Sequence, residues 1–397
     1  MASPQGLSMA GFAATAVSFG PGRIGFGLFL PQLRDAFDLS SAQAGFITSL
    51  AFLAFLAALP VASWITHRAG QRTPVTLGVL SAAVGFILVA SASSLVFLTA
   101  GVVFAGASAG FCWTPFNDAA AQVLSPGDRA GVLSAVSTGA TLGVALAAGL
   151  FLATTLSAFD WRWAWAIFAL MAGAALALAG RQVPAGGAQP GAAFTIGELS
   201  RFLQPRLTAL YAVSLCFGAV NAVYLAYAAL HVTQAGGLTG LPDPAASAVI
   251  FLIYGVSGLS GLAAGRLEAQ LGLRLVLTGI FLAFSSSLCL LALYPGSWAG
   301  VAASAGLHGA AVMMVSAVLS FWSLRLFPDN GSSGFTAALI AVAAGSMAGP
   351  AGAGALVAEV GAAATLVVFA ALPLMLAVAL AVKRDPTSAS LTAVERF

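Results

Sequence analysis

The stretch QAGFITSLAFLAFLAALPVASWI, residues 43–65, with the following THRAGQR, residues 66–72, decides the fold class of this chain. The first part is apolar and has about the 20 residues that a helix needs to cross roughly 30 Å of hydrocarbon. The second part is short and carries Arg68, Gly70 and Arg72. An apolar run that ends in a basic turn is typical of a helix that crosses a membrane and reaches its surface.

The same alternation of apolar run and short turn repeats along the whole chain. Hydrophobic residues make up 60% of the 397 residues and charged residues only 7%, whereas a soluble domain carries about 25% charged residues. We therefore predict an all-α membrane protein with twelve transmembrane helices. The predicted spans are 8–31, 43–65, 74–93, 96–122, 130–156, 161–180, 206–231, 245–265, 274–294, 297–323, 333–357 and 361–382.

The basic residues predict the orientation of these spans. With the N-terminus inside, twelve of the 15 Lys and Arg residues fall in inner turns, only Arg34 and Arg162 fall outside, and Arg23 lies within the first span. Positive charge marks the cytoplasmic side. The N-terminus MASPQGLSMAG lacks the basic residues of a signal peptide. We expect a multi-pass protein of the bacterial inner (plasma) membrane with both termini cytoplasmic.

The two halves of the chain resemble each other at an offset of 202 residues. Gly70 and Arg72 correspond to Gly272 and Arg274, and other matches keep the same place in the topology. Duplicated units are common in secondary transporters, which bind substrate between the repeats. We predict an N-terminal six-helix bundle at 1–181, a cytoplasmic linker at 182–205, a C-terminal six-helix bundle at 206–382 and a cytoplasmic tail at 383–397.

Short motifs carry a resemblance to the major facilitator superfamily. The family's loop between helices 2 and 3 reads G-x-L-a-D-R-x-G-R-[RK], and Arg68, Gly70 and Arg72 match it, while His67 stands at the Asp position and Ser63 at the first Gly. The second copy keeps Gly265, Leu267, Gly272 and Arg274. The resemblance extends over the chain through its topology. It implies two pseudo-symmetric six-helix bundles and transport by alternating access.

Other motifs of that family are degenerate here. Helix 4 keeps Gly106 and Gly110, but Val102 replaces the buried Arg that many relatives use in proton coupling. The G-x-x-x-G-P core of the family's drug/proton antiporters occurs in helix 11, at Gly345 to Pro350, and not in helix 5. Helix 1 carries the run GPGRI of a poorly characterised bacterial branch. Glycines four residues apart, such as Gly139 and Gly143 in helix 5, predict close helix packing.

Arg23 is the most informative residue of the sequence. It lies near mid-membrane, where an unpaired charge costs from about 3 to well over 10 kcal/mol. No Asp or Glu lies at matching depth in any predicted span. We therefore interpret Arg23 as a site for a substrate anion. A structural Arg bonded to the carbonyls of a helix broken at Pro21 and Pro31 is the alternative.

The resemblance implies that helices 1, 4, 7 and 10 line a central cavity. Polar and aromatic residues converge at one level of these helices, which suits a substrate pocket. The predicted substrate-binding residues are Arg23, Trp113, Asn117, Asn221, Tyr224 and His308, with Tyr227 as a membrane-interface residue. The predicted coupling and gating residues are His308, Asp118, Arg68, Arg72 and Gly70.

These residues support a transporter of a small solute, an organic anion or carboxylate, with protons as a candidate coupling ion. An efflux pump for hydrophobic or drug-like compounds is the alternative, supported by the aromatic lining. An intramembrane serine protease is a third hypothesis, because Gly255-Val256-Ser257-Gly258 matches a G-x-S-G motif and His308 follows. We reject it, because duplication has no place in that fold. We expect a monomer surrounded by lipid, with no nucleic acid partner, cofactor or metal.

Overall fold

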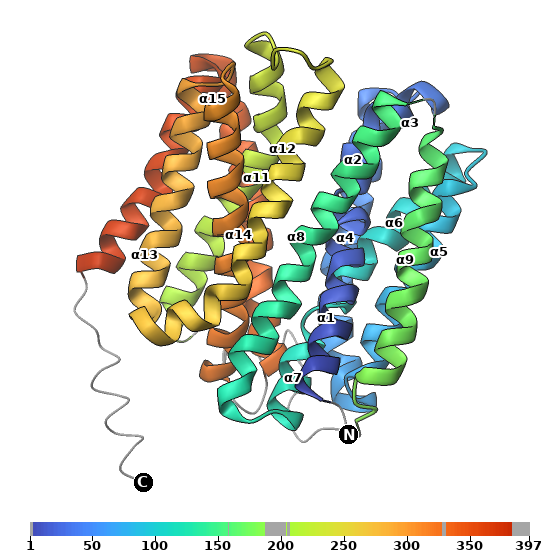
Figure 1. The fold of residues 1–397 in the computed structure, drawn as a ribbon, viewed down its shortest axis with the longest axis vertical. Helices are drawn as coiled ribbons and strands as arrows, with labels where there is room; N and C mark the ends of the chain where they lie inside the picture. The colour runs from blue at the N-terminus through green and yellow to red at the C-terminus, as the bar shows by residue number, and fades with distance from the viewer. Residues whose placement is uncertain (1–2, 158, 187–203, 205–206, 328–330, 383–397) are drawn as a thin grey trace.

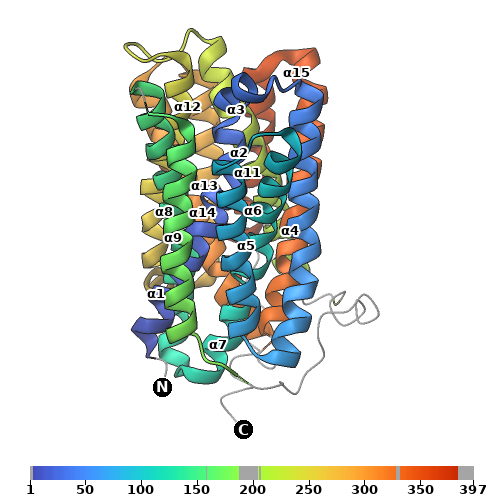
Figure 2. The same cartoon turned by 90° about the vertical axis from the view of Figure 1, so that its right-hand side faces the viewer.

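The computed structural model describes residues 3–157, 159–186, 204, 207–327 and 331–382. Its helices run side by side along the long axis and form two groups, α1–α9 and α11–α15 (Figures 1 and 2). We call them the first and second bundle. The near end of the molecule is the end where α1 begins, and the far end is the one that holds α3 (Figure 1). Most of the predicted linker 182–205 and the whole predicted tail 383–397 lie outside the described residues.

The first span consists of three short helices and not of the single helix predicted over 8–31. They are α1 (Pro4–Phe19), α2 (Pro21–Leu28) and α3 (Leu30–Phe37). Pro21 and Pro31 have no N–H to donate to the preceding turn, so the helix is interrupted next to each of them. The interruption at Gly20 sets the direction of α2, the helix that carries Arg23.

The rest of the first bundle follows the predicted spans, with one break. Its helices are α4 (Ser41–Ala69), α5 (Arg72–Ala90), α6 (Leu95–Phe111), α7 (Pro115–Val123), α8 (Pro126–Leu156) and α9 (Trp161–Gln182). The fourth span, predicted as one helix over 96–122, divides into α6 and α7 before Pro115. This proline also lacks a helix N–H.

The second bundle has two long helices that bend at glycines. It comprises α11 (Thr208–Gln234), α12 (Asp243–Ser257), the 3₁₀ turn η3 (Gly258–Ala263), α13 (Ala264–Leu293), α14 (Trp298–Leu326) and α15 (Gly331–Val382). Gly272 in α13 has φ 79° and Gly361 in α15 has φ 80°. Glycine adopts positive φ readily, so each of these helices turns sharply and contains parts of two spans.

The described helices account for the predicted twelve spans. Ten helical stretches of the described chain are long and apolar enough to cross a membrane. The stretch 245–293 holds two of the predicted spans, divided at Gly272. The first span is not among the ten, because α1, α2 and α3 have only 16, 8 and 8 residues.

The repeat predicted from the offset of 202 residues also appears in backbone geometry. Gly70 has φ 76° and ψ 175°, and Gly272 has φ 79° and ψ 154°. In the first bundle, Arg72 Nε donates to Val183 O at 2.7 Å, next to the end of α9. In the second, Arg274 Nε donates to Leu380 O at 2.6 Å, near the end of α15. Each copy of the motif thus satisfies carbonyls at the end of the last helix of its bundle.

The predicted glycine pairs lie where helices approach closely. A Cβ atom on Gly139 would clash with Phe12 O of α1, and one on Gly143 would clash with Ala16 O. Gly345 and Gly349 of α15 meet the backbone of α11 in the same way. Small residues let helix backbones come together without a hydrophobic driving force, and the prediction of close packing is confirmed.

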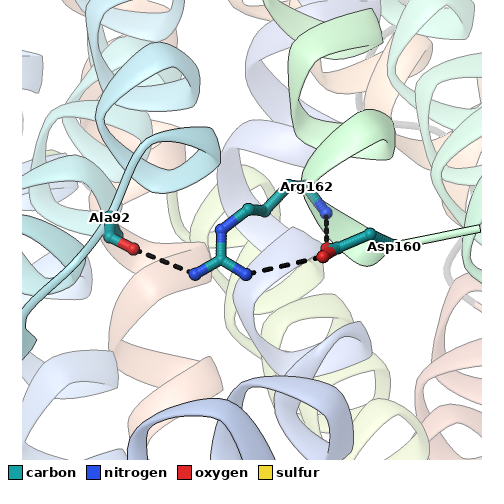
Figure 3. A network of polar contacts seen from close by, with 3 residues as sticks. All are labelled: Ala92, Asp160 and Arg162. Atoms are coloured by element: carbon teal, nitrogen blue, oxygen red, sulfur yellow. Dashed lines mark hydrogen bonds and ion pairs between the residues drawn. The ribbon is translucent and has the colours of Figure 1, made fainter.

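Arg162 shows why one arginine lies at the far end. Its guanidinium donates to Ala92 O at 3.1 Å, after the end of α5, and lies 3.6 Å from Asp160 Oδ2 (Figure 3). Its own N–H donates to Asp160 Oδ1 at 2.8 Å. Arg162 therefore fastens the start of α9 to the end of α5, which is a structural role at this surface.

Candidate functional site

A cavity of about 370 Å³ lies between the two bundles in the far half of the molecule. From the first bundle it is lined by residues of α2, α3, α4 and α6, and from the second by Leu225, Ala229, Ser247 and Phe251 of α11 and α12. All of these helices begin or end at the far end (Figure 1). Most of the lining is apolar, and Arg23 is the charged residue in it.

Arg23 enters the cavity from the first bundle inside an aromatic cage. Its guanidinium carbon is 4.3 Å from the ring centre of Phe55, 5.7 Å from that of Phe52 and 5.9 Å from that of Phe19. Cations are attracted to aromatic faces, more so where water is scarce. Within the described chain Arg23 makes no hydrogen bond or ion pair, and its side chain is half-buried. The structural alternative, in which Arg23 bonds to carbonyls of the broken helix, is therefore not observed.

Tyr254 of α12, in the second bundle, packs against the cavity-lining residue Phe251. The side chains of Tyr254 and Arg23 are close enough to interact electrostatically. The Tyr254 hydroxyl donates to Asn221 Oδ1 at 3.3 Å. Asn221 lies one helical turn before Leu225, a lining residue of α11. The second bundle thus has a hydroxyl and an amide near the cavity, and the amide N–H groups of Asn221 suit a carboxylate.

His308 and Tyr224 lie behind Tyr254, fully buried in the second bundle. Their rings stack with centres 3.8 Å apart. His308 Nδ1 is 3.2 Å from Ser287 Oγ, and Ser304 Oγ is 3.4 Å from the Tyr224 hydroxyl. His308 Nε2 has no hydrogen-bond partner in the described structure. Neither ring is among the residues that line the cavity, and the part of both residues in substrate binding stays a prediction.

Trp113 and Asn117 lie below the cavity, in the contact that closes the near end. Asn117 Nδ2 donates to Ser320 O at 3.0 Å and lies 3.3 Å from Ser323 Oγ, and Ser320 Oγ donates to Asn117 Oδ1 at 2.8 Å. The Trp113 and Phe335 ring centres are 5.3 Å apart. Neither residue is among those that line the cavity, and their part in substrate binding stays a prediction.

A pair of hydroxyls also joins the bundles at this end, where Ser63 Oγ lies 3.2 Å from Ser333 Oγ. We call the contacts of Trp113, Asn117 and Ser63 with α14 and α15 the near-end contact. Its members are buried and uncharged. The near-end contact is closed, while the cavity lies in the far half of the molecule.

The predicted gating residues lie around the near-end contact. Asp118 is 4% exposed and follows Asn117 on α7. Arg68 packs over the Trp64 ring at 4.4 Å. His67, at the motif's Asp position, has Nδ1 2.8 Å from Ser63 O of its own helix. Gly70 forms the turn, and Arg72 reaches Val183 as described above.

Sequence reasoning missed Tyr254, Phe52 and Phe55 at the site and the ion pair of Glu268 with Arg325. Both oxygens of Glu268 accept from Arg325, at 2.7 and 2.8 Å. Glu268 follows Gly265 and Leu267 of the second motif copy, and that copy could have pointed to it. Tyr254 had no signal of its own, because one aromatic residue in an apolar run reads as packing.

The described residues contain no group of three His, Cys, Asp or Glu that could hold a metal ion.

The model of the family described as Major Facilitator Superfamily matches residues 7–267. Human Monocarboxylate transporter 11 is 37% identical over 107 residues, 27% of this chain and 22% of that protein. The mouse protein of the same name is 34% identical over 107 residues, 27% of this chain and 23% of that protein. The match thus spans less than a quarter of either relative.

Two solved structures share the fold over nearly the whole chain. The human organic anion transporter MFSD10 (TETRAN) has a TM-score of 0.73 at 16% identity, covering 96% of this chain and 100% of that one. FucP in the outward conformation has a TM-score of 0.72 at 14% identity, covering 95% of this chain and 98% of that one. At these identities the likeness shows the fold alone.

Proposed function

We propose that this chain, which belongs to the Major Facilitator Superfamily, moves a small organic anion, a carboxylate, across the bacterial inner membrane by alternating access. The family and the fold make it a multi-pass membrane transporter that acts on small molecules, and not an enzyme. The substrate class, the membrane and the orientation are the proposed part.

The observation that carries the proposal is Arg23 in its cavity. The guanidinium is permanently charged and presents N–H groups in a fork that matches a carboxylate. Its aromatic cage covers faces of the guanidinium but accepts no N–H. No protein group of the described chain accepts from it, so a substrate anion would supply the missing acceptors.

The names of similar proteins support an anionic substrate. The curated relatives with local matches are named monocarboxylate transporters, and one structural neighbour is named an organic anion transporter. The local matches cover a small part of each protein, and the structural neighbour contributes the fold alone. The charge of Arg23 remains the main argument.

The apolar lining favours a second candidate, an efflux pump for hydrophobic or drug-like compounds. Phe26, Phe52, Phe55 and Phe251 all line the cavity. Such walls bind apolar bodies. A lipophilic cation would be repelled by Arg23, so the choice of ligand charge separates the two functions.

The protease hypothesis has no support in the geometry around His308. The hydroxyl within reach of His308 Nδ1 belongs to Ser287 and not to Ser257 of the G-x-S-G match. Proton coupling through His308 stays a prediction. We also propose a monomer in a lipid bilayer, with the near end in the cytoplasm and the cavity on the outer side.

A thermal-shift screen of the purified protein tests the proposed substrate class. A ligand that binds the folded state stabilises it by mass action. We expect small carboxylates to raise the melting temperature and lipophilic cations to leave it unchanged. Stabilisation by the cations and by none of the carboxylates would replace the anion proposal with the efflux pump.

A further inference from the structure

The electrostatic balance of the cavity constrains how the transporter can operate. Arg23 contributes one positive charge that no accessible pH removes. The residues that line the cavity include no acid, and the ion pairs of Asp160 with Arg162 and of Glu268 with Arg325 lie outside the lining. The empty site therefore carries a net charge of about +1, and a site loaded with a monoanion carries about 0.

We propose that this transporter, provided that Arg23 binds the anion as proposed above, is an obligatory exchanger that carries one monoanion inward for each monoanion it carries outward. The exchange mode follows from the lone cation between the bundles. It adds to the proposed function that the substrate is a monoanion and that the exchange itself produces no net flux of substrate.

The reason lies in the step between the two open states. Alternating access passes through a state in which the cavity is closed at both ends. In the present conformation the cavity lies in the far half, and the residues that would enclose Arg23 further are apolar, as Phe251 and Leu225 are. Enclosing a bare charge among them is costly, whereas enclosing a neutral guanidinium–carboxylate pair is much less so. The empty carrier would therefore stay open, and only the loaded carrier would change sides.

The aromatic cage does not replace a counter-ion. Phe19, Phe52 and Phe55 stabilise the guanidinium through their ring faces, and such contacts contribute a small share of what water provides. The Tyr254 hydroxyl already donates to Asn221 Oδ1, so it presents only its oxygen to Arg23. The second bundle thus offers dipoles and no charge.

The same balance disfavours a proton as the obligatory partner. His308 contacts Tyr224, Tyr254, Phe284 and Ser287, and none of these carries a negative charge. A proton added there would return the loaded carrier to a net charge of about +1. A dicarboxylate would leave a net negative charge, which selects for monoanions with an apolar body.

Exchange can be measured in proteoliposomes that hold the full chain. Labelled lactate is one probe, and labelled benzenesulfonate is a second that stays ionised and crosses lipid poorly. Vesicles are filled either with the same unlabelled anion or with zwitterionic buffer alone. We expect uptake into anion-filled vesicles to be faster by about 100-fold or more. An imposed potassium diffusion potential should have little effect on it, because the exchange is electroneutral.

Asn221→Asp is the variant that separates exchange from other modes. It would place a carboxylate next to the Tyr254 hydroxyl and so provide Arg23 with a counter-ion from the second bundle. We expect weaker anion binding and a smaller ratio of exchange to net uptake. Asn221→Leu removes the same amide without adding charge, so it should also weaken anion binding and lower both uptake rates, but the ratio of exchange to net uptake should remain that of the wild type.

Three results distinguish the possible failures. Equal uptake into both kinds of vesicle would overturn exchange and leave the anion site intact. An Asn221→Leu variant that lowers the ratio as much as Asn221→Asp would also overturn it, because charge would then not be the cause. Absence of both binding and uptake for both probes would instead overturn the anion site itself.

Discussion

Arg23 is tolerated in the middle of a membrane span because aromatic ring faces and the open cavity share its solvation. Phe55 covers the guanidinium at 4.3 Å, and the half-buried side chain still reaches the space between the bundles. This arrangement stabilises the cation without using its N–H donors. A residue that is stabilised but still has free donors is suited to a ligand and less suited to a packing role.

Arg23→Lys and Arg23→Ala measure the part that Arg23 has in binding. The lysine keeps the charge but loses the fork, so anion affinity should fall by about 1–3 kcal/mol. The alanine should abolish the anion-induced thermal shift in a protein that still folds, because removing the charge also removes its desolvation cost. Melting temperatures with and without anion report both quantities.

Arg162→Ala is the matched control for this series. Its guanidinium joins Ala92 and Asp160 at the far end, outside the cavity lining. We expect a lower melting temperature and an unchanged anion-induced shift. If Arg23→Ala lowers the melting temperature and leaves the anion-induced shift unchanged, Arg23 is a structural residue.

His308→Gln separates a proton relay from a structural role. If His308 carried a coupled proton, the variant would flatten the pH dependence of transport and leave exchange intact. The exchange mechanism predicts a pH profile that is the same as that of the wild type and a lower melting temperature, because the stacking on Tyr224 is lost. Uptake rates of the variant and the wild type, measured across pH, distinguish the two roles. A variant profile that is flatter than that of the wild type would support proton coupling through His308.

The sequence predicts some of the residues at the site and misses others. Arg23 stands out because a charge in an apolar run has no routine explanation. Tyr254 and Phe55 are ordinary residues of such runs, and their importance comes from a contact between α2, α4 and α12 that no local pattern encodes. The contacts of Trp113 and Asn117 with α15 and α14 depend likewise on the break before Pro115, whose geometry no local pattern encodes.

The broken helices determine which residues meet between the bundles. Pro21 begins α2, whose Arg23 lies in the cavity between the bundles, and Pro115 begins α7, whose Asn117 bonds to α14. Both prolines were visible in the sequence as helix-disrupting residues. The direction of the helix after each break depends on packing against neighbouring helices, which the sequence alone does not specify.

The near-end contact is held by uncharged groups, and so it should be easy to loosen. Asn117→Leu removes three hydrogen bonds with α14, each with a net value of about 1 kcal/mol. We expect the near end to open more often. A cysteine at Thr336, buried beside Phe335, should then react faster with a soluble maleimide in a background without native cysteines.

Ser304→Ala is the control for the near-end experiment. It removes a hydroxyl from the same helix, α14, but at a place that contacts Tyr224 and Ser287 in the second bundle alone. Labelling of the Thr336 cysteine should remain at the wild-type rate. Equal labelling in Asn117→Leu and wild type would show that these hydrogen bonds do not hold the near end.

At the scale of the whole molecule, the described basic residues set the proposed orientation. Arg68, Arg72 and Arg274 lie at helix ends of the near side, and Arg162 lies at the far side. Reporter fusions after residues 70, 127, 190, 270 and 330 should therefore report cytoplasm. Fusions near 36, 159, 238 and 296 should report periplasm. One consistent inversion across a half would contradict the twelve-span topology.

Spin-label distances across the cavity mouth test the central claim that an anion on Arg23 draws the bundles together. One pair of labels sits at the exposed Asp35 and Gln234 of the far end, and a second at the exposed Gln122 and Gln270 of the near end. The probe is benzenesulfonate, compared in wild type and in Arg23→Ala. We predict that the anion shortens the far-end distance and lengthens the near-end distance in wild type and changes neither in Arg23→Ala. The same anion-dependent shifts in both proteins would contradict the account.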